Sequence, residues 1–413
     1  MPKATSDDHV YVDSLIRKIV SECPRRQPTS EDEHKALEIM AEELQAQGLE
    51  IERHHFKFND NLYANLLLHA ATATAGTAVS AVAPALGLVM HLGSALSYWA
   101  DSTRRGYYLR RLFPFKDSFN VLATMKAKKK PALRVVMMGH ADAAFTGWVF
   151  NPKVTKLTVT PGDKPLHFLQ RSLSFMVATQ FALAGIDAVK IVLGPFALPL
   201  RPLECLLTLP SALATVMNAQ IVLKNEIVPG ANDNLSACAA LPVLAKRLRA
   251  TQRDDVEYVF VVTGCEEASM GGADALGRVM KERWGWDPSD TVFVGLDGLG
   301  NGDLRFLQTE GEVCSISVPQ WLIDTTNELT ASDPKYAEVT GFHVPVGGSD
   351  IAALLVKGYD GICLACVDPT TGAPRHYHMP TDDPDHLEMD KVMFSIEYAE
   401  KLVHAIVKRK LGL

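Results

Sequence analysis

Three apolar runs in this sequence each lead into a histidine or a carboxylate, and this repeated pattern is the strongest constraint on the fold. The runs are residues 133–138 before His140, residues 256–262 before Glu266 and Glu267, and residues 291–296 before Asp297. Such apolar runs are typical of central strands in a sheet that is covered on both faces. Polar side chains that follow parallel strands meet at one edge of the sheet. The sequence therefore predicts an α/β fold with a site at that edge.

Apolar periodicity places helices and further strands around these runs. Helical spacing and capping patterns predict helices over residues 10–20, 30–49, 241–249, 270–284 and 386–408. Further strands are expected at residues 51–58, 119–125 and 362–366. The chain thus alternates strands with helices, which is the order typical of a layered α/β fold.

Composition narrows the class of protein. The 413 residues are 47% hydrophobic and 22% charged, which is typical of a folded chain. A net charge of -7 argues against a nucleic-acid partner. Seven cysteines without a CxxC spacing indicate reduced thiols, and the polar, acidic N-terminus lacks a signal-peptide pattern. We therefore expect a cytoplasmic protein, either free or associated with the cytoplasmic face of a membrane.

Two apolar segments differ from the alternating pattern. Residues 66–100 contain no Asp, Glu, Lys or Arg, and Pro84 divides them into two expected helices. Each helix would have about 17 residues, the short limit for crossing a bilayer. A basic stretch follows at residues 104–116. The second segment, residues 166–223, is also apolar but carries charged side chains at Arg171, Asp187, Lys190, Arg201 and Glu204.

A turn at residues 230–236, with the sequence GANDNLS, carries the residue that organises the candidate site. Pro229 and Gly230 interrupt the preceding segment and a helix follows, so Asp233 is expected at a helix N-terminus. A lone aspartate there would be a helix cap. Together with the imidazoles and carboxylates of the other strand ends, Asp233 can instead bridge two cations.

The candidate ligand set combines two imidazoles with three carboxylates. Its members are His140, Asp233, Glu267, Asp297 and His378. This mixture suits Zn2+, with Co2+ or Mn2+ as substitutes, and two ions that share a carboxylate would lie about 3.5 Å apart. Asp142 is spaced to accept the ring N–H of His140 and fix its tautomer. Glu266 is expected to act as the general base, because adjacent side chains in extended backbone point to opposite sides.

Four motifs that carry these residues resemble a known family. They are GHAD at 139–142, GANDNLS at 230–236, TGCEEASMGG at 263–272 and RHYHMPTDDPD at 375–385. Together with the strand that ends at Asp297, they resemble the di-zinc exopeptidases that include bacterial leucyl aminopeptidases and glutamate carboxypeptidase. The resemblance implies a three-layer α/β/α sandwich with a mostly parallel central sheet. The roles it implies are one zinc on His140 and Asp297, the other on Glu267 and His378, Asp233 as the bridge and Glu266 as the base.

The resemblance covers residues 1–60, 118–145 and 225–413, which are expected to form the catalytic domain. It leaves the apolar insertions at 61–117 and 146–224 unexplained. We expect these insertions to form a helical subdomain beside the site, as a lid, a homodimer interface or a membrane contact. Periodicity cannot distinguish between these roles, because buried and lipid-facing helices have the same pattern.

The expected activity is hydrolysis of an amide bond in a peptide or acyl-amide substrate by a zinc-dependent metallopeptidase, with aminopeptidase action preferred. Three alternatives stay open: an amidase of N-acyl amino acids or lipid amides, a cyclising acyltransferase like glutaminyl cyclases, and an inactive membrane or receptor module. The presence of His140 argues against the single-zinc cyclase, and Glu266 argues against an inactive module. Arg375 and Tyr377 flank His378 and are candidates for substrate contact, although no substrate-binding residue is assigned.

Overall fold

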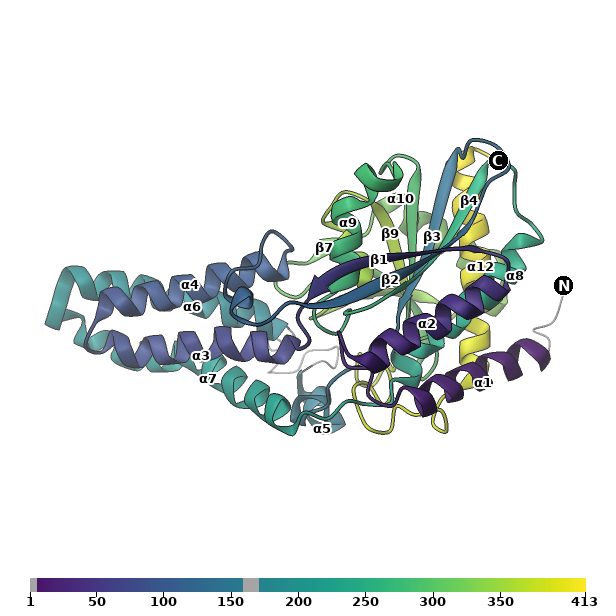
Figure 1. Cartoon of the computed structure of the whole chain (residues 1–413). Helices are drawn as coiled ribbons and strands as arrows, with labels where there is room; N and C mark the ends of the chain where they lie inside the picture. The colour runs from purple at the N-terminus through teal and green to yellow at the C-terminus, as the bar shows by residue number, and fades with distance from the viewer. Residues whose placement is uncertain (1–5, 159–170) are drawn as a thin grey trace.

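A computed structural model of the chain describes residues 6–158 and 171–413. The first five residues and part of the second apolar insertion, residues 159–170, lie outside the described residues. Within the described ranges, nine strands form one sheet in the order β1-β2-β4-β3-β5-β9-β6-β7, with β8 paired to β6 (Figure 1). The strands are β1 (Glu50–Phe58), β2 (Lys116–Met125), β3 (Leu133–His140), β4 (Val256–Thr263), β5 (Thr291–Asp297), β6 (Asp303–Glu310), β7 (Ile316–Ser317), β8 (Thr340–His343) and β9 (Asp360–Val367).

The middle of the sheet is parallel and its edges are antiparallel. Strand β3 pairs in parallel with β4 and β5, and β5 pairs in parallel with β9. Strands β1 and β2 add antiparallel pairs at one edge, and β6 pairs antiparallel with β9 towards the other. Because β3, β4 and β5 run in the same direction, their carboxyl ends lie together, and the predicted site residues follow those ends.

Helices cover both faces of the sheet. Side chains of β3 alternate between two cores: Val135 and Met137 belong to one, and Val136 and Met138 belong to the other. The first face is covered by α1 (Ser6–Glu22), α2 (Glu31–Ala46), α8 (Ser236–Arg249), α10 (Gln320–Ser332) and α12 (Met389–Leu411). The second is covered by α9 (Gly271–Trp284) and α11 (Asp350–Leu355). The predicted α/β/α sandwich with a mostly parallel central sheet is thus confirmed.

The apolar insertions form a bundle of four long helices that projects from one end of the sandwich (Figure 1). Its members are α3 (Leu62–Ser80), α4 (Pro84–Ser102), α6 (Ser172–Leu193) and α7 (Arg201–Lys224), while the short α5 (Pro152–Thr158) lies near its foot. Helix α4 begins at Pro84, a position where proline needs no helical N–H partner. Helices α4 and α7 each pack against both α3 and α6, so they occupy opposite corners of the bundle.

Candidate metal centre

His140 is the last residue of β3, and its ring is oriented by the chain that follows. Its Nδ1 lies 3.1 Å from the main-chain carbonyl oxygen of Asp142. A carbonyl oxygen only accepts, so Nδ1 carries the hydrogen and Nε2 keeps its lone pair for the site. We expected the Asp142 carboxylate to accept this ring N–H. That carboxylate lies 3.6 Å from Nδ1, and it accepts the main-chain N–H groups of Glu266 and Glu267 at 3.1 and 2.8 Å.

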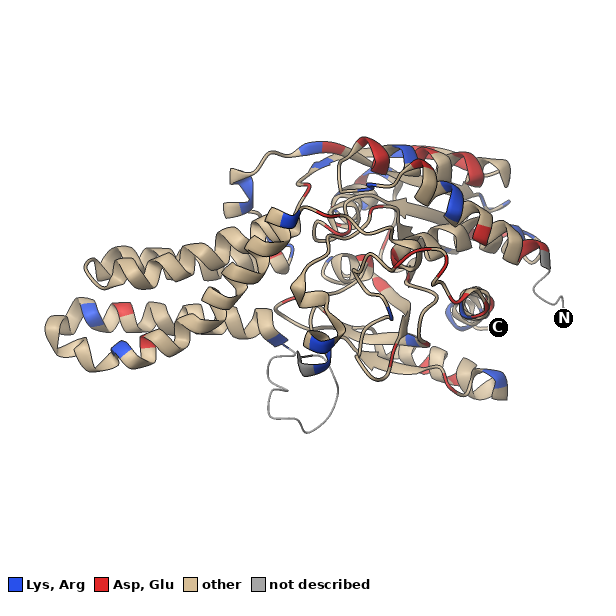
Figure 2. Ribbon diagram, turned by 90° about the horizontal axis from the view of Figure 1, so that it is seen from below, with Lys and Arg blue, Asp and Glu red and all other residues tan. Residues whose placement is uncertain are grey.

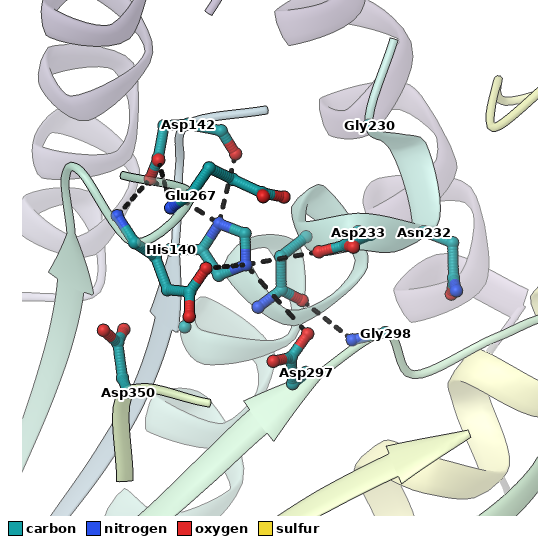
Figure 3. Close-up of polar contacts among 12 residues, drawn as sticks. His140, Asp142, Gly230, Asn232, Asp233, Glu267, Asp297, Gly298 and Asp350 are labelled. Atoms are coloured by element: carbon teal, nitrogen blue, oxygen red, sulfur yellow. Dashed lines mark hydrogen bonds and ion pairs between the residues drawn. The ribbon is translucent and has the colours of Figure 1, made fainter. Parts of the chain in front are cut away.

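Asp233 lies between two histidines, His140 and His378, which precede and follow it in the sequence. Its Oδ1 is 3.2 Å from Nε2 of His140, and its Oδ2 is 3.2 Å from Nε2 of His378. Gly230 has a positive φ of 60°, and a Cβ atom there would lie 2.6 Å from the carbonyl oxygen of Asp233. Glycine at this position therefore permits the turn that directs the carboxylate into the site. Figure 3 shows Asp233 directed towards His140.

The polar residues around Asp233 attach this turn to the loop after β5. Asn234 accepts the main-chain N–H of Gly298 at 3.0 Å and donates to the carbonyl oxygen of Leu296 at 2.9 Å. Asn232 accepts the N–H of Gly300 at 2.7 Å. These bonds hold the loop that begins at Asp297 next to Asp233, so the two carboxylates are placed together by the side-chain amides of the motif.

Three residues that position this site were not predicted from the sequence. Buried Arg26 donates to the carbonyl oxygens of Ala141 and Pro229 at 2.9 and 2.7 Å, and so joins the chain after His140 to the chain before Asp233. Buried Asp382 accepts the main-chain N–H of Asp233. Nothing in the sequence around Arg26 distinguishes it. Asp382 lies in the motif at residues 375–385, which could have pointed to it.

The third missed residue is Glu33, for which the sequence indicated only a capping box. Ser30 does cap α2, since its hydroxyl accepts the N–H of Glu33 at 3.1 Å. The Glu33 side chain is fully buried and accepts the main-chain N–H of Cys265 at 2.7 Å and the hydroxyl hydrogen of Ser118 at 2.7 Å. Glu33 therefore holds the residue that immediately precedes Glu266.

The structure brings all five predicted ligands together and adds Glu266 beside them. One cluster contains His140, Asp233 and Asp297, and a second contains Asp233, Glu267 and His378; within each, the ligand atoms lie within 4.8 Å of one another. Asp233 belongs to both. Glu266 forms a third such cluster with His140 and Glu267. Each of the first two clusters offers one imidazole nitrogen and two carboxylate oxygens, a ligand set that zinc accepts.

The electrostatics of the clusters also fit a cation. Burial, together with neighbouring carboxylates, raises the pKa of Glu266 and of Glu267 well above the usual range, and it raises the pKa of Asp297 to about 8. Burial also acts to raise the pKa of Asp233, but hydrogen bonds with His140 and His378 outweigh it and lower that pKa. Oε1 of Glu267 is buried, lacks a hydrogen-bond donor and lies 3.4 Å from Nε2 of His378. A divalent cation would supply the missing partner, so the residues fit a metal.

The first helix of the bundle forms part of the wall of the site. The hydroxyl group of Tyr63, near the start of α3, is 3.4 Å from Nδ1 of His378. The ring of Phe150 packs on the His378 ring with 4.5 Å between centroids. Tyr377, one of the two candidate contact residues, packs beside His378, whereas Arg375 pairs with Glu388. The guanidinium group of Arg375 is therefore already engaged.

Known proteins share both the sequence pattern and the fold. A family model described as Peptidase family M28 matches residues 216–401, which include five of the six site residues and begin after His140. No curated protein sequence matches the chain. Solved structures with a similar fold include BSAP, a zinc aminopeptidase from Bacillus subtilis, with a TM-score of 0.54 and 13% identity, covering 97% of this chain and 94% of that chain.

Two further solved structures show the same likeness. The aminopeptidase from Aneurinibacillus sp. strain AM-1 has a TM-score of 0.53 and 14% identity, covering 96% of this chain and 95% of that chain. Porphyromonas gingivalis glutaminyl cyclase has a TM-score of 0.54 and 10% identity, covering 96% of this chain and 97% of that chain. At these identities the likeness establishes the fold, and the family match supports a zinc-dependent hydrolase. The resemblance carried by the four motifs is confirmed by a match of residues 216–401 to Peptidase family M28 and by structural neighbours that include zinc aminopeptidases.

Proposed function

We propose that the protein is a di-zinc aminopeptidase that removes the N-terminal residue of a peptide by hydrolysing its first amide bond. The observation that carries the proposal is the pair of clusters that share Asp233 and contain one histidine each. When bound, two zinc ions would polarise the scissile carbonyl group and lower the pKa of the attacking water. His140 and Asp297 would hold one ion, Glu267 and His378 the other, and Asp233 both.

Glu266 is the proton carrier in this proposal. Its Oε2 lies 3.9 Å from Nε2 of His140, whereas the adjacent Glu267 points to His378. The two side chains therefore face different parts of the site, although both residues lie in the turn beyond β4 and not in the extended backbone that was expected. Glu266 accepts a proton from the attacking water and returns it to the leaving amine, and its raised pKa helps it to hold the proton in between. The Asp142 carboxylate positions Glu266 by accepting the main-chain N–H of Glu266.

The charge around the site favours a free amine over a terminal carboxylate as the recognised end of the substrate. Asp350, which holds no ion in this proposal, lines the same small cavity as His140, and its buried Oδ1 has no hydrogen-bond donor. Arg375, which could have bound a substrate carboxylate, is paired with Glu388. A protonated N-terminal amine is complementary to this acidic lining, which supports an aminopeptidase over a carboxypeptidase.

A matched set of substrates tests this assignment. The zinc-loaded protein would be assayed with an aminoacyl anilide, its N-acetylated form and a long-chain N-acyl amino acid. We expect hydrolysis of the free-amine substrate, with kcat/KM at least about 100-fold lower for the acetylated form, because a buried carboxylate then loses its cationic partner. A preference for the N-acyl substrates would replace the proposal with the amidase alternative.

The glutaminyl cyclases among the similar structures support a second candidate, cyclisation of an N-terminal glutaminyl residue with release of ammonia. The two reactions differ in metal stoichiometry, because the cyclase alternative uses one zinc. Ammonia release from a glutaminyl peptide would be measured in parallel with zinc content. Cyclisation that saturates at one zinc per chain would favour this candidate, whereas hydrolysis that requires two would exclude it.

A further inference from the structure

The outer surface of the bundle formed by α3, α4, α6 and α7 is apolar. At every exposed position between residues 62 and 102 the side chain is alanine, glycine, valine or leucine. Between residues 173 and 223, Arg201 is the single charged residue among the exposed positions, and the others are apolar side chains, glycine, proline and Cys205. Figure 2 shows the bundle as mostly tan, in contrast to the charged helices of the sandwich.

This apolar surface surrounds the bundle and does not form one patch. On α4, Val89 is 64% exposed, and on α7, at the opposite corner, Leu209 is 59% exposed. At the far end, Val82 and Phe196 are 88% and 85% exposed. A single protein partner covers one side of a bundle, and it would leave the other corner and the tip in water. An apolar solvent covers all of them.

The interior of the bundle combines buried apolar side chains, such as Leu183 and Ile186, with polar and charged side chains that pair with one another. A bundle in water buries mainly apolar side chains and exposes its charges. Buried Asp187 pairs with His91 at 2.7 Å and accepts a hydrogen bond from Ser80. Buried Lys190 pairs with Glu204. Nearer the sandwich, His69 bonds Ser97 at 2.9 Å, and Gln180 donates to Ser211 at 3.2 Å. Ionisable side chains in membrane helices face the bundle interior and pair with one another, as they do here.

The length of the helices matches the thickness of a bilayer. Helices α3 and α4 have 19 residues each, and α6 and α7 have 22 and 24. Nineteen residues rise about 28 Å in a helix, and the hydrocarbon layer of a bilayer is about 30 Å thick. By length and composition, the stretch Ser172–Lys224, which comprises α6 and α7, is the one part of the described residues that qualifies as a membrane span, and 33% of its qualifying window is buried. Both hairpins return to the sandwich.

Aromatic and basic side chains gather where the bundle meets the sandwich. The Arg105 guanidinium lies 4.6 Å from the ring centroid of Trp99, near the end of α4. Tyr108 follows at 65% exposure, and Trp148 is 58% exposed in the chain beyond β3. Tryptophan, tyrosine and arginine are enriched at the boundary between hydrocarbon and water. Their position at the foot of the bundle indicates the level of the lipid head groups.

We propose that the bundle inserts into the hydrocarbon layer of a lipid bilayer, while the sandwich stays at the surface on one side. Trp99, Arg105 and Tyr108 then lie at head-group level. Because Tyr63 of α3 reaches His378, the candidate metal centre lies at the foot of the bundle, next to the membrane surface. This placement of the bundle in the bilayer is the same whichever reaction the candidate metal centre performs.

The native cysteines provide a test of this placement. Of the seven cysteines, the structure exposes Cys205, in the first turns of α7 near the tip, and Cys314, which follows Val313 at the foot of the bundle, where the Val313 carbonyl accepts from Ser174 of α6. The variants Cys314→Ser and Cys205→Ser each leave one site for a polarity-sensitive fluorophore. The full-length chain would be purified in mild detergent and reconstituted with phosphatidylcholine vesicles. We expect the emission of the Cys205 probe to shift to the blue and to be quenched by brominated acyl chains, and we expect both effects to be smaller for the Cys314 probe at the foot of the bundle.

Matched charge substitutions give an independent measure. Val89→Glu and Leu209→Glu introduce a carboxylate on opposite corners of the bundle, and Val10→Glu does so at a 61% exposed valine of α1. Each bundle variant should lower partition into the vesicles by about 100-fold, since a charged side chain is poorly tolerated in hydrocarbon. Val10→Glu should not. Circular dichroism would verify that the variants are folded.

Two outcomes would overturn the proposal. If both fluorophores stay in water and the bundle variants partition like Val10→Glu, the bundle does not enter lipid. A detergent-free chain that sediments as a discrete dimer and ignores vesicles would show that a second copy covers the bundle instead.

Discussion

The carboxylate of Asp382 accepts the main-chain N–H groups of Asn232 and Asp233 at 2.8 and 3.1 Å. Asp233, which belongs to both clusters, is therefore held through its backbone by Asp382, a residue 149 positions away along the chain. Burial and the charge of Asp233 raise the pKa of Asp382 to about 8. The two aspartates consequently act as one unit, in which Asp382 sets the direction of the Asp233 carboxylate.

The first prediction is that Asp382→Ala weakens zinc binding by about 10- to 100-fold, since loss of a residue that orients a metal ligand has effects of this size. Zinc affinity would be measured by competition with a chromophoric chelator. Asp383→Ala is the matched control, because Asp383 accepts from His386 and makes no bond to the Asp233 turn. Equal affinities for both variants would contradict the positioning role.

The adjacent glutamates should separate into two phenotypes. Glu266→Gln keeps the shape of the side chain but removes the base, so kcat should fall by about 100- to 10,000-fold while zinc content is retained. Glu267→Gln should instead reduce zinc content. Elemental analysis and steady-state kinetics on the same preparations would distinguish the two. Near-normal turnover in Glu266→Gln would show that the proton is carried elsewhere.

Removal of metal should lower stability as well as activity. Burial with nearby carboxylates raises the pKa values of Glu266, Glu267 and Asp297, so without cations these groups must either repel one another or take up protons. Dialysis against a chelator should therefore lower Tm, and added zinc should restore it as ligand linkage requires. Restored Tm and activity that both saturate at two equivalents would agree with the two clusters. A Tm that does not respond to zinc would contradict the cation site.

Glu310 should make the protein less stable as the pH rises. Burial raises the pKa of its carboxyl group to about 7, and Oε1 has no hydrogen-bond donor, whereas Oε2 accepts from Ser349. The folded state thus holds the proton more tightly than the unfolded state. Its stabilising effect is complete below the usual glutamate pKa and is lost between that value and pH 7.

Glu310→Gln keeps an acceptor for Ser349 and removes this titration. Relative to the parent, the variant should gain on the order of 3 kcal/mol in unfolding free energy between pH 4.5 and 7. Urea unfolding at several pH values, at constant zinc, measures the difference. Glu312→Gln is the control, and its effect on stability should change with pH in the opposite direction. Burial acts to raise the pKa of Glu312, but Arg104 outweighs burial and lowers it. A gain that is independent of pH would refute the assignment to Glu310.

The ion pair inside the bundle offers a further test of its polar interior. Lys190→Met leaves Glu204 buried without its cation, and loss of one member of a buried pair costs about 3–5 kcal/mol. The double variant Lys190→Met with Glu204→Leu removes both charges and should recover most of that loss. Thermal unfolding in detergent would compare the variants. Equal Tm values for the single and double variants would indicate that the pair is not desolvated.

Much of the sandwich could be predicted from the sequence, and so could the five candidate ligands that the structure groups together. Apolar runs of strand length that end at or shortly before His140, Glu267 and Asp297 identify the centre of a parallel sheet, because its carboxyl edge collects such side chains. Strands β6, β7 and β8 were not predicted. They lie toward the edge of the sheet, and their mixture of polar and apolar residues has no continuous apolar run to mark it.

The contacts that hold the candidate ligands in place, and the way the insertions pack, are visible only in the folded structure. Glu33 was expected only in a capping box and Arg26 was not singled out, yet both are buried and bind site loops 232 and 203 residues away along the chain. Likewise, the sequence shows charged residues in the second apolar segment, but only the fold pairs Lys190 with Glu204 and Asp187 with His91. The side chains at the strand ends could be identified from the sequence, because local periodicity marks where each strand ends. Bonds between distant segments depend on packing, which local periodicity does not contain.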